Sequence, residues 1–331
     1  MAVAANTSET YDNSLIREDL EQQYTMISPE ETPFQTMIGT GTAAESTYTE
    51  WSIVDLASPD TSNRVIEGDD APSDDAATLG RRVGNYTQLS DKVASVSSTA
   101  EAVNAAADNI QRMKMQIAIK LKEMKRDMEA MLTSNTVAAP GSSGSARATA
   151  GLPTWLTSNT VLGATGSNPA LSGTTTGYPD TALTPGTAVV FTEDNLNDVI
   201  ESCWDNGGEP TIIMLNANNK RVLSQNFTGN STRYKDSIDK RLTAAVDIYD
   251  SDFGELTVVP NRFLQTTAAD NYSVYVLDPD YMEVKFLQAP KNEPLSKSGH
   301  AERRMLSAEY ALKVHNEAAH GAVHATTGAA S

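Results

Sequence analysis

The chain has few aromatic residues and a single cysteine. Aromatic residues make up 6% of its 331 residues, which predicts a light core spread over much surface, as in an extended, loop-rich protein. The one cysteine, Cys203, excludes an internal disulfide framework and fits a reducing cytoplasm. Its neighbours Val199, Ile200 and Trp204 favour a small core residue over a reactive nucleophile.

Membrane and export signals are also missing. No stretch approaches the roughly 18 consecutive apolar residues of a membrane-spanning helix. The first residues, MAVAANTSET, lack the basic start and apolar segment of a signal peptide. We therefore expect a soluble protein that is made where it works and has no membrane partner.

Positive charge is scarce and unevenly placed. The net charge is −18, and residues 1–98 carry 17 acidic and five basic side chains, a net −12. Because nucleic acid is also negatively charged, we do not expect the net electrostatic field of this chain to support tight nucleic-acid binding. Basic residues concentrate only on one predicted helix: Arg112, Lys114, Lys120, Lys122, Lys125 and Arg126. A solvated face, or pairing with acidic neighbours such as Glu123 and Asp127, explains them better than DNA contact.

The strongest pattern present is one long amphipathic helix between Asp108 and Leu132. Its apolar residues recur at spacings of three and four and share one helical stripe: Ile110, Met113, Ile117, Leu121, Met124, Met128 and Met131. Asp108 with Gln111 forms a candidate capping box, and Ser98 with Glu101 offers a second one upstream. At about 1.5 Å per residue the helix would be close to 40 Å long, so we expect a strut.

The segments before this helix are predicted to be an arm and a hairpin. Residues 1–40 suggest an extended arm with a short helix at Ser14–Tyr24, after which Pro29 and Pro33 would break any helix. Apolar residues near Thr32-Pro33-Phe34 and Ile38-Gly39 would anchor the arm. The alternation in TYTEWSIVDL and in the return GRRVGNYTQLSDKVASVSS predicts a long β-hairpin over residues 44–97, with a charged tip at Glu67–Ala76.

The segments after the long helix differ in character. Ser134–Val190 holds only two charges amid Gly, Ser, Thr, Ala and Pro, but Leu152, Trp155, Leu156, Val161 and Leu162 interrupt it. We expect an ordered, wandering loop that packs on a neighbour. The next residues predict alternating helices and strands. We expect a helix that is capped by Thr192 and runs through Trp204, then a buried strand after Pro210, then a helix at Ala217–Gln225. The expected later strands are Val246–Tyr249, Glu255–Val259, Tyr272–Asp278, Tyr281–Gln288 and Arg303–Asn316.

Motifs for chemistry are weak throughout. The four histidines are His300, His315, His320 and His324. His315 and His320 are five residues apart, whereas a zinc-protease helix needs four, so surface or hydrogen-bonding histidines are expected. Gly39-Thr-Gly41 suggests a turn, and the pairs Asp69-Asp70 and Asp74-Asp75 lack calcium-loop spacing. We expect no catalytic, cofactor-binding or metal site, and no enzyme.

The order of these pieces resembles the major capsid (major head) proteins of tailed bacteriophages, which have the Hong Kong 97-type fold, an α+β fold. Four motifs in sequence order carry the resemblance over nearly the whole chain: ETPFQTMIG (Glu31–Gly39), KEMKRDMEAML (Lys122–Leu132), AGLPTWLTSN (Ala150–Asn159) and KSGHAERRMLSAEYALKVHNEAAHG (Lys297–Gly321). The resemblance implies an N-terminal arm (1–43), an E-loop hairpin (44–97), a peripheral domain with the long spine helix and following loop (98–191), an axial domain (192–265), and closing peripheral strands with the C-terminus (266–331).

The resemblance also implies a function and partners. The chain would self-assemble into pentamers and hexamers of an icosahedral or prolate virion shell enclosing double-stranded DNA, assembled in the host cytoplasm. Its partners would be further copies of itself through E-loop and N-arm contacts, a portal protein, a separate scaffolding protein, possible decoration protein, and packaged DNA by weak non-specific contact. The acidic balance fits a wall that does not trap DNA.

One departure from some relatives concerns covalent cross-linking through a lysine near the hairpin tip. This tip has no lysine, and its nearest cations are Arg81, Arg82 and the more basal Lys92. We therefore expect no isopeptide cross-links. The competing hypotheses are a cellular nanocompartment shell of the same fold, an extended secreted surface or adhesion protein, and a small α/β enzyme around residues 190–290.

Overall fold

The computed structural model describes residues 28, 30–68, 70, 77–102, 112–173, 175–227, 235–236, 241–242, 247–264, 272–297 and 299–327. The expected helix Ser14–Tyr24, the capping box of Asp108 and Gln111, and most of the charged hairpin tip lie outside these residues. The second expected cap differs by one residue. Helix α2 (Ser98–Ala102) starts at Ser98, and the Ser97 hydroxyl accepts the Ala100 N–H at 3.1 Å.

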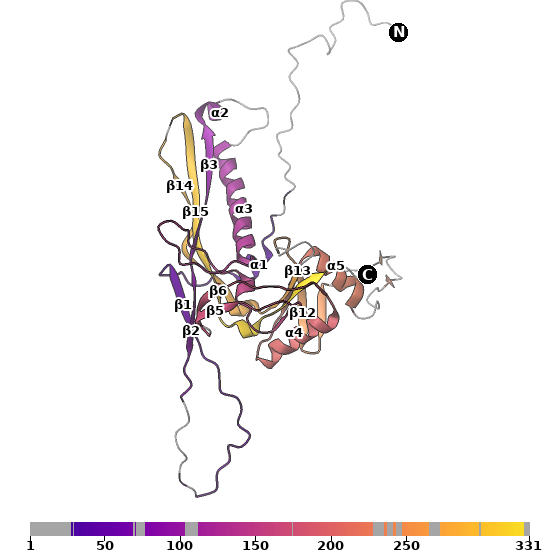
Figure 1. Ribbon diagram of the computed structural model, residues 1–331. Helices are drawn as coiled ribbons and strands as arrows, with labels where there is room; N and C mark the ends of the chain where they lie inside the picture. The colour runs from indigo at the N-terminus through magenta and orange to yellow at the C-terminus, as the bar shows by residue number, and fades with distance from the viewer. Residues whose placement is uncertain are drawn as a thin grey trace, which may run out of the picture.

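The long helix, α3 (Arg112–Leu132), is confirmed and lies along one face of a three-stranded sheet (Figure 1). Its buried apolar residues follow the expected spacing, ending one residue later than predicted: Met113, Met124, Met128 and Leu132. Met124 packs against Leu306 and Ala308 of the sheet, with Ile117 and Leu121 alongside. The apolar stripe therefore fixes which face of the strut meets the sheet.

The sheet beneath α3 has the order β14-β15-β3, with β14 (Met282–Pro294), β15 (Ala301–Val314) and β3 (Gln88–Ser97) all antiparallel. β14 is longer than the expected strand, and β15 begins two residues earlier. Along β15 every residue from Leu306 to Leu312 is buried. Both of its faces are covered there, because α3 lies on one face and the base of the hairpin on the other.

The hairpin is confirmed, but its return strand is divided. β1 (Tyr48–Ile53) pairs antiparallel with β2 (Arg81–Tyr86) from Tyr48↔Tyr86 to Ile53↔Arg81. The expectation of a single return strand to Ser97 is wrong, since β3 pairs with β15 instead. Tyr48 is the first residue of β1, so the chain beyond Tyr86 has no β1 residue left to pair with and continues into the other sheet.

Residues 30–32 are not helical, and Pro33 begins a helix that the sequence analysis did not predict. α1 (Pro33–Ile38) carries proline at its first position, where the missing N–H is not needed and the fixed φ suits a helix. The expected apolar anchor is confirmed, since Phe34 and Ile38 are buried in the main core. After α1, residues 39–44 hydrogen-bond along β14 through Gly41 and Ala44.

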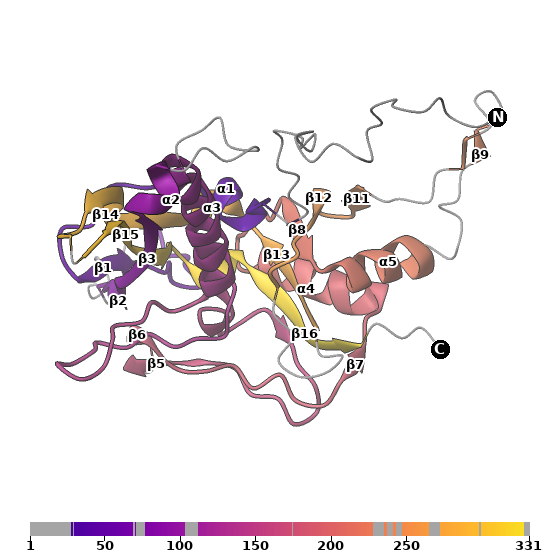
Figure 2. The same ribbon diagram turned by 90° about the horizontal axis from the view of Figure 1, so that it is seen from above.

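A seven-stranded sheet forms the other half of the molecule (Figure 2). Its order is β11 (Ile248–Ser251), β12 (Gly254–Pro260), β8 (Ile212–Leu215), β13 (Tyr272–Leu277), β16 (Gly321–Thr327) and β4 (Thr160–Val161), with β7 (Val189–Val190) also on β16. β16 has no counterpart among the expected strands. Because β13 and β16 come from residues 266–331, the boundary expected at residue 265 falls inside one sheet.

Two helices cover one face of this sheet, and the main core covers the other. α4 (Glu193–Asp205) and α5 (Ala217–Asn226) pack on Ile213, Val258 and Val276. The opposite face contributes Met214 and Tyr275 to the main core. Thr192 caps α4 as expected, its hydroxyl accepting the Asn195 N–H at 3.3 Å. A sheet buried on both faces explains the unbroken apolar runs of these strands.

The charge-poor segment after α3 is ordered, as expected, and it packs into its own chain. Leu152, Trp155 and Leu156, around the short 3-10 helix η1 (Leu152–Thr154), are buried in the main core. β5 (Ala170–Gly173) and β6 (Thr176–Thr181) extend the hairpin into a sheet of order β1-β2-β6-β5. Remaining short elements are β9 (Lys235–Asp236), β10 (Arg241–Leu242), η3 (Pro279–Tyr281) and η4 (Glu317–Ala319).

Candidate functional site: the hairpin and its anchored base

The loop joining β1 to β2 exposes apolar side chains to solvent. It extends away from the folded body at the lower end of Figure 1. Five large apolar residues of this loop are exposed by 60–92%: Val54, Leu56, Val65, Ile66 and Leu79. At its base, Ile53 and Val83 are buried in the main core. Scattered exposed apolar residues are ordinary on a protein surface, but five on one loop make this loop a candidate contact surface.

The base of the hairpin is held by aromatic packing. Tyr48 stacks on Tyr86 with ring centroids 4.6 Å apart, and the Tyr178 ring of β6 meets both, at 6.2 and 5.1 Å. Burial, with the nearby Glu50 carboxylate, raises the pKa of Tyr48 to about 12. Gly84 permits this contact, because a Cβ there would lie 2.7 Å from the Tyr48 ring. The three rings therefore pack together at the base of the hairpin, and Tyr48 stays neutral at neutral pH.

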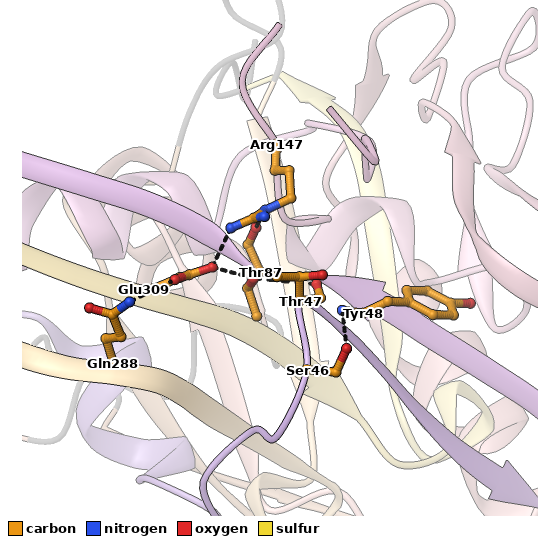
Figure 3. Close-up of polar contacts among 7 residues, drawn as sticks. All are labelled: Ser46, Thr47, Tyr48, Thr87, Arg147, Gln288 and Glu309. Carbon is orange, nitrogen blue, oxygen red and sulfur yellow. Dashed lines mark hydrogen bonds and ion pairs between the residues drawn. The ribbon is translucent and has the colours of Figure 1, made fainter. Parts of the chain in front are cut away.

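A buried carboxylate joins the base to the three-stranded sheet (Figure 3). The side chain of Glu309 on β15 is 5% exposed. It accepts hydrogen bonds from the Thr87 hydroxyl at 2.7 Å, from the Arg147 guanidinium at 2.5 Å and from the Gln288 amide at 3.4 Å. The Arg147 Nε–H also donates to the Thr87 carbonyl at 3.3 Å. The Thr87 N–H and hydroxyl also donate to the Thr47 carbonyl. The Glu309 carboxylate therefore joins β15 to four other segments, those of Thr47, Thr87, Arg147 and Gln288.

A fully buried amide forms a second junction at the same place. Asn85 of β2 donates from Nδ2 to the Thr149 hydroxyl at 3.0 Å and to the Leu312 carbonyl at 2.7 Å. Its Oδ1 accepts the N–H groups of Tyr86 and Ala150, both at 2.9 Å. All the hydrogen-bonding capacity of the side chain is satisfied. The base of the hairpin is thereby fixed to β15 and to the segment after α3.

The N-terminal segment is held by a third buried polar group. Glu129 of α3 is fully buried and accepts the Phe34 and Gln35 N–H groups at 2.8 and 2.9 Å. It also accepts the Asn261 Nδ2 at 2.7 Å. Burial raises the pKa of this carboxyl, and the hydrogen bonds oppose that rise. Glu129 thus binds the open N–H groups at the start of α1 and fixes where the arm leaves the body.

The chain as a whole is similar to known proteins in sequence and in fold. Residues 4–327 match the family model described as SU10 major capsid protein. The chain belongs to that family. It is 25% identical over 350 residues to the major capsid protein of Escherichia phage Phieco32, covering 96% of this chain and 97% of that protein.

Solved structures show the same fold at low sequence identity. The capsid of a native GTA particle matches with a TM-score of 0.64 and 12% identity, over 98% of this chain and 100% of the other. A Mycobacterium phage Bobi chain gives 0.59 and 11%, over 97% and 99%. The SrpI encapsulin of Synechococcus elongatus PCC 7942 gives 0.52 and 10%, over 92% and 93%. The Hong Kong 97-type, α+β fold of this major capsid protein is confirmed.

The expectations for Cys203 and the histidines have different outcomes. Cys203 is a buried core residue, and burial raises the pKa of its thiol to about 12, as suits an inert side chain. Of the two expected kinds, surface or hydrogen-bonding histidines, His320 and His324 are of the second kind, since both are fully buried. Both do form hydrogen bonds: His320 Nδ1 accepts the Asp278 N–H at 3.2 Å, and His324 Nδ1 lies 2.9 Å from the Ser273 hydroxyl.

The remaining candidates give no chemical constellation in the part of the chain that the structure describes. There, no three His, Cys, Asp or Glu side chains are placed to hold a metal ion, and no helix is long and apolar enough to cross a membrane. On α3, Lys120 pairs with Glu123 and Lys122 with Glu30, both at 2.8 Å, as expected for a face with acidic partners. The family is a structural capsid family, not an enzyme family.

Sequence reasoning missed the buried polar junctions. Glu309, Arg147, Asn85 and Glu129 are ordinary polar residues in their segments. The available signal was positional: Glu309 interrupts an apolar run in LSAEYALKV, and Glu129 lies next to the apolar stripe of α3. A charge in such a place needs a partner, but the sequence does not identify which distant residue supplies it.

Proposed function

We propose that the chain assembles into pentamers and hexamers of an icosahedral or prolate head, with residues 54–80 of each copy lying over its neighbour. The supporting observation is the set of exposed apolar residues on a loop whose base is rigidly held. In the single chain, 92% of the surface of Leu56 is exposed to solvent. Burial of five such side chains on a neighbour supplies about 1.5–3 kcal/mol each, against which ordering of the loop must be set.

The domain names implied by the resemblance are proposed with two changes, which concern β3 and the pair β13 and β16. The peripheral domain comprises α3 with the β14-β15-β3 sheet, and the E-loop comprises the β1–β2 hairpin without β3. The axial domain comprises α4, α5 and the seven-stranded sheet, including β13 and β16. Residues 1–43 remain the N-terminal arm, from which α1 packs against α3.

The proposed partners beyond further copies of the chain are a portal protein, a separate scaffolding protein, a possible decoration protein, and packaged double-stranded DNA by weak non-specific contact. The excess of acidic over basic side chains, −18 in total, supports the weak DNA contact. The proposed location is the virion capsid, assembled in the host cytoplasm.

A same-fold nanocompartment shell is the second candidate, supported by the encapsulin match. The two functions differ in what the shell encloses. Shells purified from expression with an intact phage genome, treated with nuclease and then opened, would release protected DNA for a phage head and a cargo enzyme for a nanocompartment.

The assembly test compares the wild-type chain with Leu56→Ser/Ile66→Ser. We expect closed shells, pentamers or hexamers of the wild type by electron microscopy and sedimentation, in the presence of scaffolding protein if it is needed. The double variant should fold normally, because both side chains are exposed, yet fail to form shells. Thr61→Ala/Ser62→Ala, on the same loop, is the control. Shells formed equally well by the double variant would contradict the role of the loop.

A further inference from the structure

One flank of α3 carries a row of exposed side chains beside the apolar stripe that packs on the sheet. The row consists of Lys114, Ala118, Lys122 and Lys125, which are all exposed. They are spaced by four, four and three residues, so they lie one above another along the helix. At about 1.5 Å per residue the row is about 16 Å long. Three positive charges therefore lie along a rigid helix, with one small side chain among them.

Acidic partners neutralise only a small part of this lysine row. Lys122 pairs with Glu30, but their side chains are 48% and 45% exposed, so the pair is weak and open to exchange. Among the described residues, neither Lys114 nor Lys125 has an ion-pair partner. The acidic residues of α3 are engaged elsewhere: Glu123 with Lys120, Asp127 with Lys92, and Glu129 with the backbone of α1. The row therefore keeps most of its positive charge for another molecule.

A straight row of amines suits a stiff polyanion, and duplex DNA suits it better than an acidic polypeptide does. DNA carries one negative charge per about 1.7 Å of its axis, and amines that bind its phosphates release condensed counterions. An extended acidic polypeptide carries at most one charge per about 3.3 Å. The small Ala118 side chain leaves room for a broad cylinder to approach. The net charge of −18 opposes this contact, but at physiological salt charges beyond about 8 Å are screened.

We propose that Lys114, Lys122 and Lys125 form the surface through which each copy contacts packaged double-stranded DNA. This inference rests on the proposed phage head and adds the site of the weak DNA contact named there. The amines bind phosphate oxygens and do not read base edges, so the contact is independent of DNA sequence. Three phosphate contacts bind weakly in one copy, but a shell presents many copies to one DNA molecule, which strengthens the whole.

The first test measures binding of a fluorescent duplex of about 30 base pairs to the full chain, by anisotropy, at salt concentrations between about 0.05 and 0.2 M. The row variant is Lys114→Gln/Lys122→Gln/Lys125→Gln. The matched control, Lys291→Gln/Lys297→Gln/Arg303→Gln, removes three exposed cations from β14, β15 and the turn between them. Both variants change the net charge equally, so they separate a local surface from the overall field. Circular dichroism checks that each variant folds.

For the wild type we expect the logarithm of the association constant to fall with the logarithm of salt concentration with a slope of about −3, which corresponds to three phosphates. Two duplexes of unrelated sequence should bind equally. The row variant should lose most of this slope and bind about 10-fold or more weakly at low salt, whereas the control should keep the slope. Wild-type binding by the folded row variant, or an equal loss in the control, would overturn the inference.

A second test adds a charge to the row. Ala118→Lys should tighten duplex binding and steepen the salt slope by about 1, whereas Ala289→Lys, at an exposed alanine of β14, should change neither. No gain from Ala118→Lys would contradict the inference.

Poly-glutamate is the competitor in both tests. Displacement of the duplex by poly-glutamate at equal charge concentration would assign the row to an acidic protein and overturn the DNA assignment. If the wild type binds the duplex through the row but never forms shells with scaffolding protein, the proposed function fails and the row remains a DNA-binding surface.

Discussion

At the scale of single residues, the molecule is organised by a few buried polar groups that connect segments distant in sequence. Glu309 joins β15 to Thr87 and Arg147, and Asn85 joins β2 to Thr149 and Leu312. Each group is satisfied by several partners, so it costs little in the folded state but much if one partner is removed. These junctions hold the base of the hairpin, while apolar side chains of the loop beyond it, such as that of Leu56, stay exposed.

Replacing Glu309 should therefore destabilise the isolated subunit. In Glu309→Ala the Thr87 hydroxyl and the partly buried Arg147 guanidinium lose their acceptor, and we expect a loss of about 2–4 kcal/mol in the free energy of unfolding. Urea unfolding followed by circular dichroism measures it. Glu293→Ala, whose half-exposed side chain pairs with Lys291, is the control and should change stability by less than about 0.5 kcal/mol. Equal effects would contradict the structural role of Glu309.

The two buried histidines should make the fold acid-sensitive. Burial lowers the pKa of His320 to about 4 and that of His324 to about 3. In the unfolded chain they titrate near pH 6.5, so between about pH 6.5 and 4 the unfolded state binds more protons and stability falls as pH falls. Each histidine contributes up to about 1.4 kcal/mol per pH unit. The raised pKa of Glu129 acts in the opposite direction.

The measurement is urea unfolding at several pH values between 7.5 and 4.5, comparing wild type with His324→Gln. The variant should be less stable at neutral pH but show a shallower loss of stability on acidification. His300→Gln, which changes an exposed residue, should keep the wild-type slope. An unchanged slope in His324→Gln would show that His324 is not the acid-sensitive group.

At the scale of elements, local patterns predicted α3, α4 and α5, because each of these helices has one buried face, whereas the short helix α1 was not predicted. The stripe on α3 and the Thr192 cap of α4 are local patterns, and the structure has both. Strand partners were less predictable. From its sequence, β3 is predicted to be the return strand of the hairpin. It pairs with β15 instead, because β1 begins at Tyr48 and offers no further residues for pairing. Pairing of this kind is non-local, so no window of sequence contains it.

The packing of α3 on its sheet gives an element-scale prediction. Met124 is 1% exposed between Leu306 and Ala308. Met124→Ala leaves a cavity there, and we expect a loss of about 2–4 kcal/mol in the free energy of unfolding. Lys125→Ala, one residue later on the exposed face, should change it by less than about 0.5 kcal/mol. Thermal or urea unfolding of both variants checks the difference, and equal stabilities would mean that the strut is not packed through this face.

At the scale of the whole molecule, the chain combines two well-packed halves with a loop whose described apolar side chains are exposed. The exposed fraction of Leu56, 92%, contrasts with complete burial of Leu312 at the sheet below. In the proposed assembly, the subunit would bury this apolar surface on its neighbours, so stability and association would be coupled.

Covalent cross-linking of the assembled particle is not expected. The first lysine of the sequence is Lys92, which lies in β3 rather than on the loop. Its amine is 2.6 Å from the Asp127 carboxylate, and this hydrogen bond raises the pKa of Lys92, which keeps the amine protonated and poorly nucleophilic. Mature particles boiled in detergent should run as one band at 35.4 kDa on a denaturing gel. A ladder of higher bands would contradict this.

The sequence by itself determined the local elements and the order of the pieces: the strut helix, the hairpin, the α/β rhythm and the four motifs by which the chain resembles capsid proteins. These depend on side-chain spacing and turn chemistry, which short segments contain. Only the tertiary structure decided that β3 pairs with β15 and that β8, β13 and β16 form one sheet. It also decided that Pro33 starts a helix whose first N–H groups are bound by Glu129. Those outcomes depend on which distant groups satisfy one another's hydrogen bonds and bury one another's apolar faces.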